Sequence, residues 1–334
     1  MFFRCLHKMV LQRGGKAVKG RYKVFVQNNK LRYEFYVNRN ITIIRGDSAT
    51  GKTTLLDMLR EYEAEGSASG ITVKCDVECR VLGGRHWREN LSFIHSSIVF
   101  IDEGNSFVRS QDFAFEVKNS GNYFVIVTRD DLPNLAYSVD EIYGLRVSNK
   151  YMGLKQCYNE FFHIYGKYDS AVIKNEKTLI VEDSNSGYDF FRAVKGELSK
   201  CFSAHGKSNV ITLLRMHFDK SILVIADGAA FGCEMDKINQ IIESGGNISL
   251  YLPESFEWII LKSGLIDGVE EILSHPYDFI ESSEFFSWER FFSDVLREKT
   301  RDTFLQYTKK ELNPVYLEEN NRKKLLDVLE PIKL

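Results

Sequence analysis

Residues 41 to 56 read ITIIRGDSATGKTTLL, an apolar run that ends at a glycine and is followed by a second glycine, a lysine and two threonines. The spacing Gly46-x4-Gly51-Lys52-Thr53 is that of a phosphate-binding loop, the Walker A motif. Its glycines permit a turn that presents successive backbone N–H groups to an anion, and the next helix adds its positive N-terminus. We expect Lys52 to reach the β and γ phosphates of a nucleotide and the Thr53 hydroxyl to bind magnesium. The expected nucleotide site comprises Gly46, Asp47, Ser48, Ala49, Thr50, Gly51, Lys52, Thr53 and Thr54.

A second motif is the run SSIVFIDEGNSF at 96–107, in which an apolar segment ends in Asp102 and Glu103. This is the arrangement of a Walker B motif, in which a carboxylate at the end of a strand holds magnesium. We expect Asp102 to do so and Glu103 to polarise the attacking water as a general base. An acidic pair that merely ends a strand at the surface is the alternative, and the glycine loop upstream favours the catalytic interpretation.

The strand-like segment YFVIVT at 123–128 ends in Thr128 and is followed by Arg129. The order of loop strand, further strand, acidic strand and polar-ended strand resembles the additional-strand group of P-loop ATPases rather than the nucleotide kinases. This resemblance implies that Thr128 senses the γ-phosphate and that Arg129 is a candidate catalytic arginine. The chain contains no guanine-reading Asn-Lys-x-Asp sequence, which favours ATP over GTP.

Two further apolar runs end in carboxylates, TLIVEDSNSGYDFF at 178–191 and SILVIADGAAFG at 221–232. In α/β folds the carboxyl ends of parallel strands meet at one sheet edge, so we expect Glu182 and Asp227 to lie together. Two such carboxylates can share a divalent cation.

This pair resembles the TOPRIM fold of topoisomerases, primases and the OLD family of ATPase-nucleases, whose first strand ends in a glutamate and whose later strand ends in Asp-x-Asp. A P-loop ATPase followed by a TOPRIM-like domain is also the layout of OLD proteins, and PARIS-type antiphage systems use the same two ingredients. The resemblance implies a magnesium site at Glu182 and Asp227. The sequence departs from the pattern at Gly228 and Ala229, where the second aspartate is missing, and at Ser186, where the family commonly has an acidic residue.

These departures favour a degenerate TOPRIM-like domain that binds rather than cleaves, although Glu254 and Glu257 could supply missing ligands. The segment LIVEDS also resembles the start of a response-regulator receiver. No phosphoacceptor aspartate or later Thr and Lys partners follow it at receiver spacing.

The elements around these motifs alternate between strands and helices, which indicates parallel sheets covered on both faces. The expected elements are a hairpin at 21–37, helices at 53–62, 108–118, 188–200 and 234–243, and strands at 71–77, 97–102, 123–128, 178–183, 210–216, 221–228 and 248–253. A polar stretch at 143–157 serves as the expected boundary. We therefore predict an α/β fold with a P-loop ATPase domain at 1–150, a smaller TOPRIM-like α/β domain at 165–270 and a helical C-terminal segment at 271–334.

Composition narrows the function classes only a little. Forty-four Lys and Arg residues against 46 Asp and Glu give a formal charge of −2, so no overall basic field indicates nucleic acid. The six cysteines are scattered and lack Cys-x-x-Cys spacing, which indicates reduced thiols. We expect a cytoplasmic protein without a signal peptide, a transmembrane span or a membrane partner.

Together the motifs predict a magnesium-dependent ATP-binding protein and ATPase whose nucleotide state controls the TOPRIM-like domain, in a mobile-element or phage-defence context. A homo-oligomer is expected, because no strong arginine finger is evident in cis. Nucleic acid and protein are both candidate partners of the second domain. A nucleotide-dependent switch or assembly factor without nucleic-acid chemistry is the first alternative, and a small-molecule phosphotransferase is the second.

Overall fold

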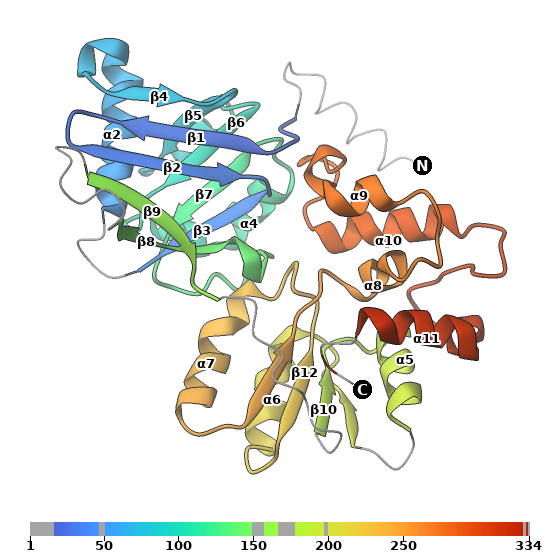
Figure 1. The fold of residues 1–334 in the computed structure, drawn as a ribbon. Coiled ribbons are helices and arrows are strands. Elements are labelled where there is room, and N and C mark those ends of the chain that lie inside the picture. The colour runs from blue at the N-terminus through green and yellow to red at the C-terminus, as the bar shows by residue number, and fades with distance from the viewer. Residues whose placement is uncertain are drawn as a thin grey trace.

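The structure is a computed structural model that describes residues 17–46, 51–148, 157–165, 178–196, 200–329 and 332. Within this part of the chain the fold is mixed α/β, with one sheet of nine strands and another of four. Figure 1 shows the larger sheet in blue and green, the smaller sheet below it, and orange and red helices of the C-terminal segment beside both.

The larger sheet combines a parallel core with an antiparallel hairpin. Its strands are β1 (Tyr22–Gln27), β2 (Leu31–Val37), β3 (Ile41–Arg45), β4 (Thr72–Lys74), β5 (Glu78–Leu82), β6 (Ser97–Ile101), β7 (Tyr123–Val127), β8 (Ile142–Val147) and β9 (Cys157–His163), in the order β4-β1-β2-β9-β8-β3-β7-β6-β5. Neighbours from β8 to β5 are all parallel. The prediction of a parallel sheet is wrong for the rest of this sheet, because β1 pairs antiparallel with β2 and β4, and β8 pairs antiparallel with β9. Strand β2 is parallel to β9, which joins the predicted hairpin to the same sheet.

The stretch expected to separate two domains begins as a strand of this sheet. Strand β8 occupies its start, and β9 lies beyond the predicted limit at residue 150 and pairs antiparallel with β8. Both strands contain exposed or half-exposed side chains. Their polar residues are explained by a sheet that has one face in contact with solvent. The larger sheet therefore uses the chain up to His163.

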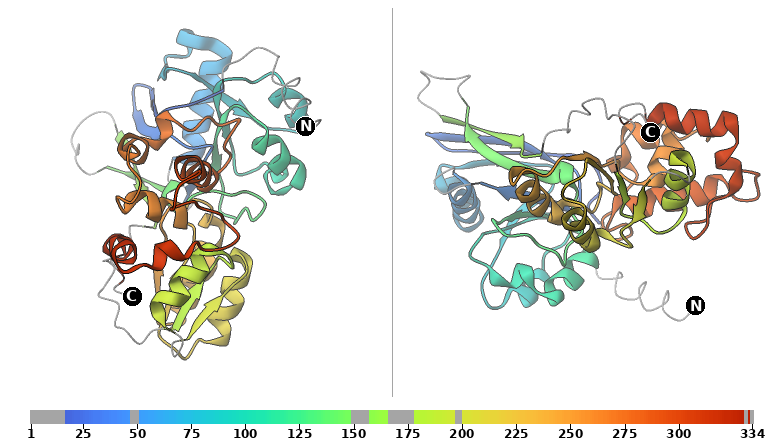
Figure 2. Two further views of the ribbon diagram at one scale, coloured as in Figure 1. Left: turned by 90° about the vertical axis from the view of Figure 1, so that its right-hand side faces the viewer. Right: turned by 90° about the horizontal axis from the view of Figure 1, so that it is seen from below.

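Helix α2 (Lys52–Glu65) packs on the parallel core through apolar side chains at helical spacing. Leu55, Leu56 and Leu59 are buried in a cluster that also contains side chains of β1, β2, β6 and β7. In the right-hand view of Figure 2, α2 lies beside the blue strands of the hairpin and the green strand β9. This packing fixes the start of α2 against the end of β3, where the predicted loop lies.

The opposite face of the parallel core is covered by α4 (Gln111–Lys118), whose Phe113 and Val117 are buried. The same cluster continues into the smaller sheet and its helices. At the junction Gly232 lies against Tyr137, where an added Cβ would come within 2.5 Å of the ring. The two sheets therefore share one apolar core.

The smaller sheet contains β10 (Thr178–Val181), β11 (Cys201–Ser203), β12 (Ile222–Ile225) and β13 (Ile248–Tyr251), in the order β11-β10-β12-β13, with every pair parallel. The strand predicted at 210–216 is wrong, since this segment lies in helix α6 (Lys207–Met216). Val210, Ile211 and Leu214 are its buried residues, which is a helical spacing. A short apolar run cannot be assigned by its length alone.

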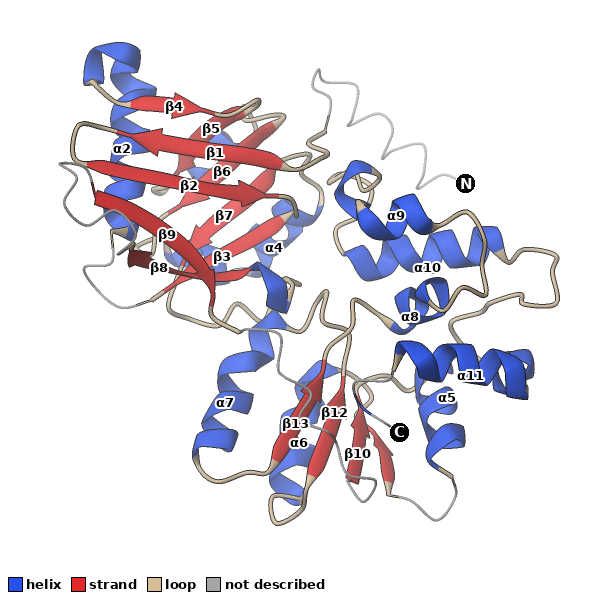
Figure 3. Cartoon of the chain, viewed as in Figure 1, coloured by secondary structure: helices blue, strands red, loops and turns tan. Residues whose placement is uncertain are grey.

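The other helices flank these sheets, as Figure 3 shows. They are α3 (Trp87–Leu91), α5 (Ser186–Lys195), α7 (Met235–Glu243), α8 (Phe256–Lys262), α9 (Glu270–Ser274), α10 (Trp288–Lys299) and α11 (Glu319–Val328), with short 3-10 turns η1 (Gly66–Ser69), η2 (Ser106–Arg109), η3 (Val139–Glu141), η5 (Gly232–Glu234), η6 (Pro276–Asp278) and η7 (Pro314–Leu317). In the segment predicted to be helical, Phe292 of α10 and Leu325 of α11 are buried in one cluster with α8. In the left view of Figure 2 the orange and red helices of the C-terminal segment lie in front of the junction between the two sheets.

Candidate functional site

The predicted phosphate loop starts at the end of β3 and is supported by the hairpin. Gly46 (φ 133°) and Gly51 (φ 92°) both adopt backbone conformations that favour glycine. Tyr33 of β2 donates a hydrogen bond of 2.9 Å to the Gly51 carbonyl. Burial raises the pKa of Tyr33 to about 12, so its hydroxyl remains a donor at neutral pH. Asp47, Ser48, Ala49 and Thr50 belong to the predicted loop and lie outside the described residues.

Lys52 is the first residue of α2, and its side chain lies across the loop. The residue is buried, and its Nζ donates a hydrogen bond of 2.7 Å to the Gly46 carbonyl. The first turn of α2 contains no acidic residue, and Thr53 and Thr54 are exposed there. A helix N-terminus of this kind attracts an anion through its free N–H groups and its dipole.

Asp102 and Glu103 lie at the same sheet edge as the loop, because β6, β7 and β3 are parallel neighbours. The Asp102 carboxylate accepts a hydrogen bond of 3.1 Å from Arg60 and one of 2.9 Å from the Glu103 N–H. The predicted metal-binding carboxylate is thus in contact with α2. Arg60 was not predicted as a site residue; it lies two helical turns after Thr53 and therefore on the same face of α2.

Thr128 and Arg129 also lie beside the loop strand. The Thr128 N–H donates to the Ile44 carbonyl of β3 at 3.2 Å. Its buried hydroxyl accepts a hydrogen bond of 3.0 Å from the Asp130 N–H and so stabilises the turn after β7. Arg129 Nε lies 2.8 Å from Glu103 Oε1. The structure therefore brings the predicted base and the predicted arginine into an ion pair, and both side chains are partly exposed.

The oxygen donors at this edge suit magnesium. Thr53 supplies a hydroxyl and Asp102 a carboxylate, both hard ligands. In the part of the chain that the structure describes, no three acidic, His or Cys side chains converge on a metal position. Magnesium is usually held by one or two carboxylates together with substrate phosphates, so a nucleotide would complete the ligand set.

Arg45 connects the loop to the smaller sheet. It directly precedes Gly46, is buried, and pairs with Asp131 at 2.8 Å and with Asp236 of α7. The Tyr137 hydroxyl accepts another of its hydrogen bonds, at 3.2 Å. Removing one partner from a buried ion pair is strongly destabilising, so these contacts hold the end of β3 and α7 in one arrangement.

A second buried ion cluster joins the two sheets at the start of β3. Arg39 forms two hydrogen bonds with Glu254, one of them 2.9 Å, lies 3.4 Å from Glu141, and stacks 3.5 Å above the Trp288 ring. Glu254, considered above as a metal ligand, is therefore engaged by Arg39 instead. Burial raises the pKa of Glu141 to about 7, although Arg39 opposes the shift.

We expect Glu141 to make stability depend on pH. Its folded-state pKa lies above the ordinary value of 4.5, so the folded protein retains a proton that the unfolded chain releases. This contribution is complete below pH 4.5 and is lost as the pH rises to about 7, on the order of 3 kcal/mol. Urea denaturation should show that the unfolding free energy of wild type, minus that of Glu141→Gln, falls as the pH rises from 4.5 to about 7. Above pH 7 this difference should stay constant. A difference that stays constant from pH 4.5 to 7 contradicts this expectation.

Glu182 and Asp227 lie together at one edge of the smaller sheet. They follow β10 and β12, which are adjacent and parallel, and a Glu182 oxygen accepts the Asp227 N–H at 3.0 Å. Burial raises the pKa of both carboxyl groups, and for Asp227 the nearby Glu289 and Glu182 raise it further. A cation at this edge would have to displace a proton, so its binding would strengthen with rising pH.

This carboxylate pair lines a hollow of about 230 Å³ to which the C-terminal segment contributes Glu289 of α10 and Lys309. The Lys309 ammonium pairs with Glu289 and lies 3.9 Å from Glu257. Burial would lower the pKa of Lys309, but Glu257 and Glu289 raise it above its ordinary value. A permanent positive charge thus lies among these carboxylates. The sequence showed a basic pair at 309–310 and gave no sign of its partners.

Two further candidate positions at this edge, Ser186 and Glu257, form hydrogen bonds with the Tyr307 hydroxyl. The Ser186 hydroxyl, at the position where an acidic residue is common in the resembling family, lies 2.8 Å from the Tyr307 hydroxyl. Tyr307 also donates a hydrogen bond of 2.8 Å to Glu257. Glu257 is therefore close to the hollow but engaged by Tyr307.

Comparison of the chain with protein-family models finds no match, and comparison with curated proteins finds none either. Within the described ranges, each helix is too short or too polar to cross a lipid bilayer.

Proposed function

We propose that this chain is a magnesium-dependent ATP-binding protein and slow ATPase whose nucleotide state controls its smaller α/β unit. The observation that carries the proposal is the position of buried Lys52 across the loop from Gly46 to Gly51, at the same sheet edge as Asp102 and Glu103. The topology supports it as well. Strand β7 lies between the loop strand β3 and the acidic strand β6, which is where an additional strand belongs in the additional-strand group.

In this proposal residues 46–54 hold the phosphates, and Thr53 and Asp102 hold magnesium. The ion would neutralise phosphate charge when bound. Arg60 would release Asp102 as the ion binds. Glu103 would take the proton of the attacking water, which requires that its ion pair with Arg129 opens or turns aside. A second copy of the chain would complete the site across an interface.

For the smaller unit we propose a TOPRIM-like domain that binds without cleaving. The parallel strands that present Glu182 and Asp227 together support the TOPRIM-like part. The ammonium of Lys309 beside them and the hydroxyl of Ser186 support the loss of a catalytic metal. Control by nucleotide would pass through Arg45 and α7.

Calorimetric titration of the purified chain with ATP and magnesium tests the proposal directly. Saturable binding that chelation of magnesium weakens is the expected result. No binding of ATP under either condition would contradict it. Analysis of the products, orthophosphate or a phosphorylated acceptor, separates the ATPase from a phosphotransferase.

The variant Glu182→Gln with Asp227→Asn separates the smaller unit from the nucleotide site. We expect its ATPase rate to stay within about twofold of wild type, because both side chains follow strands of the smaller sheet and the predicted loop follows β3 of the larger one. If the wild-type protein cleaves nucleic acid with manganese or magnesium, this variant should have lost that activity. If the protein is a switch without nucleic-acid chemistry, wild type itself should show no cleavage. A steep fall in the ATPase rate would place these carboxylates in the nucleotide mechanism instead.

A further inference from the structure

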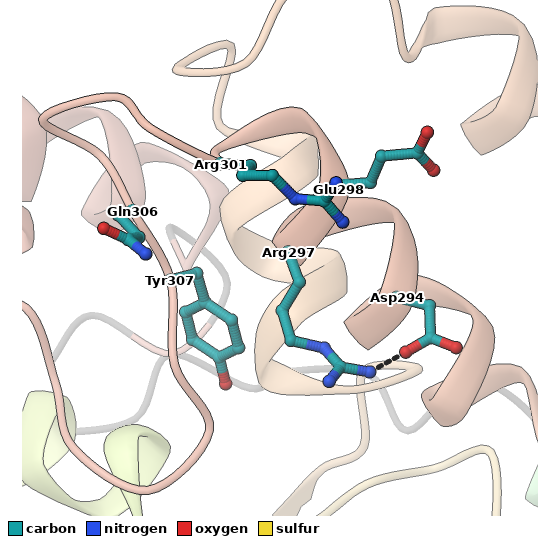
Figure 4. Close-up of a pocket in the computed structure, with 6 residues that line it drawn as sticks. All are labelled: Asp294, Arg297, Glu298, Arg301, Gln306 and Tyr307. Carbon is teal, nitrogen blue, oxygen red and sulfur yellow. Dashed lines mark hydrogen bonds and ion pairs between the residues drawn. The ribbon is translucent and has the colours of Figure 1, made fainter. Parts of the chain in front are cut away.

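A groove runs along α10 and the chain that follows it. Its first part has a volume of about 470 Å³ and is lined by the six residues labelled in Figure 4, which come from α10 and the segment after it: Asp294, Arg297, Glu298, Arg301, Gln306 and Tyr307. A second part of about 800 Å³ shares Asp294, Arg297 and Tyr307 with the first and extends to Glu289 and Lys309. Those last two residues also line the hollow of Glu182 and Asp227. The groove therefore leads from the end of α10 to that carboxylate pair.

Exposed cations line this groove. Arg290, Arg301 and Lys310 are exposed, and within the described ranges none of the three has a carboxylate partner. Arg297 pairs with Asp294, and both side chains are about half exposed. An exposed pair of this kind contributes little to stability, so Arg297 can exchange its carboxylate for a phosphate. Three carboxylates also line the groove, against five cations: the carboxylates belong to Asp294, Glu298 and Glu289, and the cations to Arg290, Arg297, Arg301, Lys309 and Lys310.

The spacing of these cations suits a nucleic-acid backbone. Arg290 and Arg297 are two turns apart on one face of α10, or about 10 Å along its axis. A single strand places successive phosphates closer together than this distance, so the two guanidinium groups would contact different phosphates of one strand. Arg301 lies two residues past the end of α10 and lines the same part of the groove as Arg297.

An exposed aromatic side chain lies in the same segment. Phe304 is 74% exposed and falls in the chain between Arg301 and Gln306, both of which line the groove. Sites for single-stranded nucleic acid combine a basic groove with aromatic rings on which bases stack. The groove and Phe304 supply these two elements within one short stretch of chain.

We propose that this groove binds single-stranded nucleic acid, with phosphates along Arg290, Arg297, Arg301 and Lys310 and a base on Phe304. The strand would then lead toward the hollow of Glu182 and Asp227. This inference deepens the function proposed for the smaller unit by naming its ligand, and it does not require nucleotide binding at the loop. The formal net charge of −2 makes general attraction to nucleic acid weak, so binding should depend on the groove.

Fluorescence anisotropy with labelled oligothymidylate of about 20 nucleotides, longer than a single binding site, tests the proposal on the nucleotide-free chain. The double variant Arg297→Gln, Arg301→Gln should weaken binding about tenfold and reduce the slope of log Kd against log salt by about 1.4, which is 0.7 for each phosphate contact. Phe304→Ala should weaken binding about tenfold without changing that slope. The matched control Lys19→Gln, Lys118→Gln removes two exposed charges elsewhere and should stay within about twofold of wild type.

Three results would overturn the proposal: no binding at low salt, equal losses in the control and the groove variants, or tighter binding of a duplex of the same length. Circular dichroism checks that each variant is folded, which the exposure of all the substituted side chains favours. The groove variants should still bind ATP as wild type does. Groove-dependent binding by a chain that fails to bind ATP would support this inference and contradict the nucleotide proposal.

Discussion

Lys52→Ala should weaken the binding of ATP with magnesium at least about a hundredfold. The substitution removes the only side-chain cation that lies across the loop among the described residues, where its Nζ is 2.7 Å from the Gly46 carbonyl. In a bound nucleotide the ammonium would make hydrogen bonds to charged phosphate oxygens, worth about 1.5–3 kcal/mol each. Two such bonds are enough for the expected loss. Calorimetric titration with a slowly hydrolysed ATP analogue measures it.

The control for this variant is Lys30→Ala, which removes an exposed lysine from the turn between β1 and β2. Its affinity for the analogue should equal that of wild type. A thermal melt of Lys52→Ala is needed as well, because the lysine also bonds the loop in the absence of nucleotide. If a folded Lys52→Ala protein bound the analogue as tightly as wild type, the loop would not be the nucleotide site.

Glu103→Gln should slow ATP hydrolysis by about 10²–10⁴-fold and leave ATP affinity nearly unchanged. Glutamine keeps the size of the side chain and a hydrogen bond to Arg129, but it cannot accept the proton of the attacking water. The effect should therefore fall on the chemical step and not on binding. Phosphate release under single-turnover conditions gives the rate, and titration gives the affinity.

Glu61→Gln on α2 is the matched control, since Glu61 is exposed on the helix that follows the loop. Its hydrolysis rate should equal that of wild type. A Glu103→Gln rate within a few-fold of wild type would exclude this carboxylate as the base. A parallel loss of affinity and rate would assign Glu103 to binding instead.

The sequence predicted those parts of the site that depend on local spacing. A phosphate loop is defined by residues a few positions apart, and the ends of parallel strands meet at one edge wherever the strands pair. This is why Lys52 and Asp102 could be placed near each other, and why Glu182 and Asp227 could be paired. The hairpin at 21–37 and the helix after the loop were predictable for the same reason.

Contacts between segments far apart in the chain could not be predicted in this way. Tyr33 supports the loop from a hairpin strand, and Glu289 and Lys309 reach the carboxylate hollow from the C-terminal segment. Nothing in their local sequence marks such partners. The strand predicted at 210–216 failed for another reason, since its apolar residues fit either period and α6 buries them at helical spacing.

Buried guanidinium groups form ion pairs at both ends of strand β3: Arg39 lies before the strand and Arg45 is its last residue. Each of these groups has a carboxylate partner that belongs to the smaller α/β unit, Glu254 and Asp236 respectively. If β3 moves, one of two things must happen. Glu254 and Asp236 move with it, or a buried guanidinium group loses its carboxylate partner. The strand that precedes the predicted phosphate loop therefore connects the two sheets rigidly, whereas a flexible connection would have left the two units free to move independently.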